Sequence, residues 1–135
     1  MSKVLDVLLS GTARNVAAKP EEKEVEILRL SREVGAPVAF RLRGLSYDQV
    51  TELKSLNDMD LKICLAGIVE PDLGSVELAR HYGVLQEGEQ WGARGVTRGD
   101  LLKALLQPGE ISDLSRVLQK MSGYLKNTVK EVKKN

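Results

Sequence analysis

The clearest hydrophobic pattern in the chain begins near residue 110. Apolar positions there follow alternating steps of three and four residues, which is the spacing of a heptad seam along one face of a helix. The stripe consists of Ile111, Leu114, Leu118, Met121, Leu125, Thr128 and Val132. Gly123 lies inside it, and a glycine within a helix costs about 1 kcal/mol relative to alanine. We therefore expect a helix that ends near Gly123, followed by a separate basic helical tail over residues 124–135.

A second pattern, with a period of two, lies between residues 24 and 43. Polar and apolar residues alternate from Glu24 to Ile27 and again from Val38 to Arg43, which puts Val38, Phe40 and Leu42 on one face. The segment between them contains the glycine and proline that a turn favours. These residues predict a β-hairpin with one buried and one solvated face.

From Ser46 onward the pattern becomes helical. Ser46 and Gln49 form a capping-box pattern, in which each side chain satisfies a backbone N–H at the start of a helix. Residues 61–69 are apolar on nearly all sides, which predicts a central buried helix that ends before Pro71. Further helices are expected over residues 75–82, capped by Ser75, and over residues 101–106.

The chain before the hairpin predicts a short helix and a linker. Val4, Leu5, Leu8 and Leu9 form a brief helical stripe, and residues 11–23 have no clear period. The predicted fold is therefore α+β and mostly α, with an N-terminal β-hairpin (about 24–43) and a compact bundle of four to five helices. Three parts follow: a helix and linker over 1–23, one globular domain over 24–123, and the tail over 124–135.

Composition and charge narrow the function. Apolar residues make up 42% of the chain and charged residues 29%, as in ordinary globular proteins, and the net charge is only +1. Such a balance gives no long-range attraction to nucleic acid or to an anionic membrane. No apolar run approaches the roughly 20 residues that a membrane helix needs. We therefore expect neither nucleic acid nor a membrane as a partner.

The residues that carry chemistry are scarce, which argues against an enzyme. His81 is the sole histidine and Cys64 the sole cysteine, so a His/Cys zinc site cannot be assembled. Cys64 lies in the most apolar segment, where a buried structural thiol is expected. The glycine-rich stretch over residues 92–100 lacks the Gly-Lys-Ser/Thr ending of a phosphate loop. We therefore expect no catalytic residue, no cofactor and no metal.

With catalysis, cofactors and metals not expected, partner binding is the function that the sequence favours. Trp91, in a glycine-rich loop, could anchor a partner or cover a core edge. The stripe before Gly123 is expected to complete the domain core, while the stripe beyond it has little chain left to cover it. That second part is expected to dock a partner helix or a second copy. The candidate partner-binding residues are Trp91, Leu118, Met121, Leu125, Val129 and Val132.

Several segments together resemble one phage protein family. Gly35-Ala36-Pro37 before Val38, Val69-Glu70-Pro71-Asp72-Leu73 after the central helix, His81-Tyr82-Gly83-Val84, and Leu105-Leu106-Gln107-Pro108-Gly109-Glu110 follow in the family's order. The chain is similar, from about Glu24 to Tyr124, to the XkdN-like tail assembly chaperones of PBSX-type contractile tails. Two loops depart in length: the one before Leu61 is shorter, and the one from Gln86 to Asp100 is longer.

The resemblance implies a non-enzymatic assembly factor. Such chaperones coat the tape measure protein, a long helical chain prone to aggregation, and keep it soluble until tail tube subunits polymerise around it. They are commonly made also as a longer, frameshifted form, and are absent from the finished tail. The resemblance therefore implies the cytoplasm of the bacterial host as the location. Two alternatives remain open: a structural component retained in the particle, and a small helix-turn-helix DNA-binding regulator.

Overall fold

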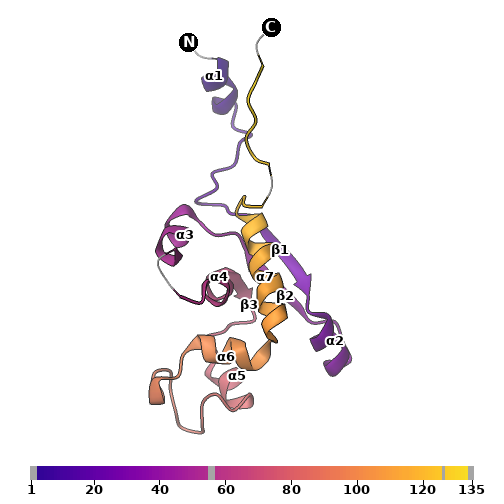
Figure 1. Cartoon of the computed structure of the whole chain (residues 1–135), viewed down its shortest axis with the longest axis vertical. Coiled ribbons are helices and arrows are strands. Elements are labelled where there is room, and N and C mark those ends of the chain that lie inside the picture. Colours follow the sequence, from indigo (N-terminus) through magenta and orange to yellow (C-terminus); the bar gives the residue numbers. More distant parts are fainter. Residues whose placement is uncertain (1–2, 55–56, 126, 134–135) are drawn as a thin grey trace.

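The computed structural model describes residues 3–54, 57–125 and 127–133, and within them the fold is α+β and mostly helical, as predicted (Figure 1). Three short strands form one sheet: β1 (Glu22–Glu26), β2 (Ala39–Arg43) and β3 (Ile68–Glu70). The α-helices of these residues are α1 (Lys3–Leu9), α2 (Leu28–Val34), α3 (Tyr47–Leu53), α4 (Met59–Gly67), α5 (Val76–His81), α6 (Arg98–Leu105) and α7 (Pro108–Met121). A single 3₁₀ turn, η1 (Ala93–Gly95), lies in the glycine-rich stretch.

The predicted antiparallel pair of strands is confirmed, but its connection is not a turn. β1 pairs with β2 in antiparallel register, with Val25 opposite Phe40. Between them the chain forms α2, which ends at Gly35 in a left-handed conformation (φ +81°). The Ser31 hydroxyl then accepts a hydrogen bond from the Val38 N–H (2.9 Å), which closes the return to β2.

The sheet has a third strand that the sequence pattern assigned to a helix. The helix expected over residues 61–69 ends at Gly67, and Ile68–Glu70 pairs antiparallel with β2. β2 is therefore the central strand, and its Arg41 forms ion pairs with Glu22 of β1 (3.5 Å) and Glu70 of β3 (3.1 Å). Phe40 and Leu42 point from β2 into the core.

Helix α7 completes the core, as its stripe predicts. Ile111, Leu114, Leu118 and Met121 are all buried, and α7 contacts both α4 and β2. The expected caps form as well: Ser46 and Gln49 make a capping box at α3, and the Ser75 hydroxyl accepts from the Leu78 N–H (3.1 Å).

The helical tail predicted beyond Gly123 is not present in the described residues. Gly123 (φ +96°) and Leu125 (φ +64°) have left-handed backbones, which end the helix, and residues 127–133 have no regular secondary structure. The predicted N-terminal helix does form, as α1, although none of its residues is buried. Figure 1 shows α1 and the C-terminal segment extending beyond the same end of the domain.

Candidate functional site

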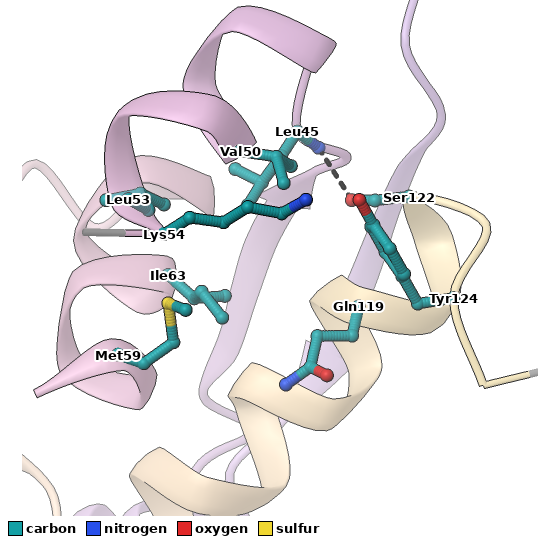
Figure 2. A pocket seen from close by; sticks show the side chains of 9 residues that line it. All are labelled: Leu45, Val50, Leu53, Lys54, Met59, Ile63, Gln119, Ser122 and Tyr124. Atoms are coloured by element: carbon teal, nitrogen blue, oxygen red, sulfur yellow. Dashed lines mark hydrogen bonds between the residues drawn. The ribbon is translucent and has the colours of Figure 1, made fainter. Parts of the chain in front are cut away.

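An apolar pocket lies between α3, α4 and the end of α7 (Figure 2). Its volume is about 160 Å³. This is below the roughly 300–1,000 Å³ of typical small-molecule sites, so it has room for a few side chains rather than for a substrate or cofactor. It is lined by Leu45, Val50, Leu53, Lys54, Met59, Ile63, Gln119, Ser122 and Tyr124.

Local sequence features build each wall of this pocket. The capping box at Ser46 fixes the start of α3, and Val50 and Leu53, three residues apart, then share one face of that helix. Met59 and Ile63, four residues apart, present the corresponding face of α4. Two short apolar helix faces therefore meet at an angle and leave a hollow between them (Figure 2).

The end of α7 closes the third side through hydrogen bonds to backbone. The Ser122 hydroxyl accepts from the Leu45 N–H (2.8 Å) and donates to the Leu118 carbonyl (2.7 Å). Gln119 is held by the buried hydroxyl of Ser115 (3.0 Å), which in turn donates to Asp60 (2.7 Å). A hydrogen-bonded frame within the chain therefore fixes this side of the pocket.

Few charged groups reach the pocket. The Lys54 side chain extends across it toward Ser122 and Tyr124 (Figure 2), and among the described residues Lys54 forms no ion pair. An apolar hollow with one cation at its rim suits the aliphatic face of a helix that also carries an acidic residue. Such a surface is typical of recognition of a protein segment.

A larger cleft, with a volume of about 440 Å³, adjoins this pocket. It shares Leu45, Val50, Ser122 and Tyr124 with the pocket. Its other side is formed by the chain before β1, including Arg14, Val16 and Ala17. The segment that leads to α1 therefore passes beside the mouth of the pocket.

Trp91 is part of its own domain. Its side chain is half-buried against the core, and its indole N–H donates to the Gly74 carbonyl (2.8 Å). The glycine-rich loop around it is tied down as well, because Arg94 makes two hydrogen bonds to Glu89 (2.7 and 2.8 Å). Those bonds, and the Gln86 N–H, lower the pKa of Glu89 to about 2. These bonds hold the glycine-rich loop against its own domain.

The other predicted partner-binding residues are divided between core and surface. Leu118 and Met121 are buried in the core, so they present no surface to a partner in this structure. Leu125, Val129 and Val132 are strongly exposed, but they lie beyond the end of α7 and do not continue its stripe. The sequence pattern therefore did not identify the pocket: its residues come from three separate elements.

The remaining candidates for chemistry have structural roles. Cys64 is fully buried, as expected, and its thiol contacts the Ile111 carbonyl (3.3 Å). Burial, together with the negative charge of Asp60, raises the pKa of this thiol to about 12. His81 is exposed and packs edge-on against Tyr82. In the part of the chain that the structure describes, no group of three or more metal-binding side chains comes together, and no helix could cross a membrane.

A small α+β fold with an apolar pocket is typical of a protein-binding domain. Comparison with known families identifies the family to which this domain belongs. The profile of the phage XkdN-like tail assembly chaperone proteins matches residues 55–133, which is more than half of the chain. The chain belongs to this family, as the resemblance predicted.

The fold is also similar to a solved structure. The crystal structure of the protein YqbN superposes with a TM-score of 0.53, covering 77% of this chain and 87% of that one, at 19% sequence identity. At this identity the similarity concerns the fold alone. No curated protein is significantly similar to the chain.

Proposed function

We propose that this tail assembly chaperone acts without enzymatic chemistry, by binding the tape measure protein and keeping it soluble during tail assembly. The observation that carries the proposal is the open apolar pocket between α3, α4 and α7. Five of its nine lining residues fall within the segment that matches the family profile. The pocket thus belongs largely to the part of the chain that defines the family.

The chemistry of the pocket fits such a partner. A tape measure chain is expected to carry aliphatic residues in stripes along long helices, and a helix presents such residues at steps of three and four. One or two of these side chains would fill the hollow beside Met59. Covering exposed aliphatic side chains removes the patches through which such chains aggregate.

The same proposal includes the wider setting of a tail assembly chaperone. The chain would act in the cytoplasm of the bacterial host and leave before the tail is complete. A longer frameshifted form and the tail tube protein would be further partners. Mass spectrometry of purified particles distinguishes this role from that of a retained structural component. Family membership favours either of these two tail-related roles, chaperone or structural component, over a DNA-binding regulator.

Co-expression with the tape measure protein of the same phage tests the proposal. We compare the wild-type chain with Met59→Asp, which puts a charge in the pocket, and with Leu28→Asp. Leu28 is a matched control because it is the exposed first residue of α2, just as Met59 is the first residue of α4. An acidic residue is well tolerated at the start of a helix, so both variants are expected to fold.

The wild-type chain and Leu28→Asp are expected to keep the tape measure protein soluble and to co-purify with it, whereas Met59→Asp is expected to lose both effects. If the tape measure protein is equally soluble without this chain, the chaperone proposal is wrong. If Met59→Asp performs as well as Leu28→Asp, the pocket is not the binding site.

A further inference from the structure

Helix α1 exposes an unusual amount of aliphatic surface for its length. Five of its seven residues are aliphatic, and none of its residues is buried. An isolated helix shorter than about 12 residues is marginal in water, so α1 needs its apolar side covered to be stable. The exposed fractions are 66% for Val4, 46% for Leu5, 66% for Val7, 57% for Leu8 and 73% for Leu9.

The two polar residues of α1 share one side of the helix, and Asp6 lies at the edge of its aliphatic face, next to Leu9. At 3.6 residues per turn, Val4 and Leu8 stack one above the other, and Lys3 and Asp6 fall on the remaining arc. The helix therefore presents a continuous apolar face bordered by one acidic residue. Among the described residues, Asp6 forms no ion pair.

The segment that joins α1 to the sheet directs the helix away from its own domain. Asn15 accepts hydrogen bonds from the N–H groups of Ala17 and Ala18 through its side chain (3.1 and 3.0 Å) and from that of Lys19 through its carbonyl (2.8 Å). This turn lies next to the pocket, in the adjoining cleft. Figure 1 shows α1 beyond the end of the domain, and no α1 residue lines the pocket.

From these features we infer that α1 of a second copy docks in the α3–α4–α7 pocket, and that two chains exchange these arms in a two-fold dimer. The aliphatic face of α1 fills the hollow between Val50 and Met59, and Asp6 meets Lys54 at its rim. Both contacts occur twice in a two-fold pair, which closes the assembly at two chains.

The inference deepens the proposed function, because the arm would cover the pocket until the tape measure protein displaces it. Its own test needs no tape measure protein. A failure of the arm exchange is therefore seen separately from a failure of the chaperone proposal.

A charge-reversal experiment on the full chain separates docking between chains from docking within one chain. Sedimentation velocity is measured for the wild-type chain, Asp6→Lys, Lys54→Asp, the double variant, and an equimolar mixture of the two single variants. The wild-type chain is expected to form a dimer, and each single reversal is expected to raise the dissociation constant about fivefold, since an exposed ion pair is replaced by like charges. In the mixture, both arm-to-pocket contacts join opposite charges, so the wild-type affinity is expected to return.

Two further substitutions in α1 extend the test. Leu8→Asp is expected to weaken the dimer by at least about tenfold, which corresponds to loss of one buried aliphatic side chain. Lys3→Ala, on the polar side of α1, is expected to have little effect. A wild-type chain that stays monomeric at all concentrations overturns the inference. The inference is also overturned if the dissociation constant of the mixture stays as high as those of the single variants while that of the double variant returns to the wild-type value. That result would place each arm in the pocket of its own chain.

Discussion

Gly67, the last residue of α4, lies directly against the side chain of Leu118 in α7. A β carbon at Gly67 would lie 2.7 Å from one terminal methyl of Leu118 and closer still to the other. Leu118 is fully buried, so its methyl groups can move aside only by displacing the core side chains around them. This contact sets how closely α4 and α7 approach, and these two helices also form two walls of the pocket.

Gly67→Ala is therefore expected to destabilise the fold by about 1–3 kcal/mol through overpacking. Gly109→Ala is the control, because nothing lies within 4 Å of a β carbon there. That variant is expected to be neutral or to stabilise by up to about 1 kcal/mol. Urea unfolding followed by circular dichroism measures both. Equal effects of the two substitutions would show that α4 and α7 are not in this close contact.

Cys64 gives a second prediction, because it is the only thiol in the chain. With a pKa near 12 its thiolate fraction at pH 8 is small. Relative to a free cysteine, this ionisation difference alone slows reaction with a disulfide reagent on the order of a thousandfold. We expect no reaction in the native protein on the timescale at which urea-unfolded protein reacts completely. Rapid labelling of the native protein would contradict the buried position of Cys64.

The Arg29–Glu110 pair predicts a specific pH dependence. Burial opposes ionisation of Glu110, but hydrogen bonds from the Arg29 guanidinium and the Gln107 N–H outweigh it and lower the pKa of Glu110. A lowered folded-state pKa contributes stability that is present above the unfolded value, about 4.3, and is lost as pH falls through the folded value.

Glu110→Gln is expected to lower the melting temperature by a few degrees at pH 7. This difference from the wild-type chain should shrink as the pH falls below about 4.3. Glu33→Gln is the matched control, since Glu33 pairs with the same arginine but is far more exposed. An effect of Glu33→Gln as large as that of Glu110→Gln, or a Glu110→Gln effect that persists at pH 2, would contradict the assignment.

Trp91 provides a prediction that separates a structural from a binding role. Trp91→Phe removes the hydrogen bond to the Gly74 carbonyl but keeps an aromatic ring against the core. We expect a loss of about 1 kcal/mol in the free energy of unfolding and unchanged co-purification with the tape measure protein. Loss of co-purification at unchanged stability would instead identify Trp91 as a partner anchor.

The fold could be predicted from the sequence where one repeat period extends over many residues. The stripe of α7 correctly indicated which side chains are buried, because a helix of this length repeats its apolar face several times. The short strand β3 could not be separated from α4, since Ile68 and Val69 continue an apolar run with no break before Pro71. Helix α2 was missed because Leu28 and Leu30 alternate with polar residues, as the neighbouring strand does.

The pocket could not be predicted, for a different reason. Val50 and Leu53 have the spacing of ordinary core-facing residues. Whether such faces are fully covered depends on how far apart the packed helices are, and the sequence pattern of one helix carries no information about that distance. In the tail, the spacing of Val129 and Val132 suggested a helix, but spacing alone does not outweigh the left-handed backbone at Gly123 and Leu125.

The central claim is that the α3–α4–α7 pocket binds aliphatic stripes of the tape measure protein. Methionine-methyl NMR tests this claim most directly. The chain contains three methionines, of which Met59 lines the pocket and Met121 is buried in the core. A tape measure peptide with an intact aliphatic stripe is titrated against one in which the stripe is replaced by serine. We predict that the intact peptide alone shifts the Met59 methyl signal, and shifts it more than that of Met121. A Met59 signal that stays unchanged while the intact peptide saturates the protein would contradict the account.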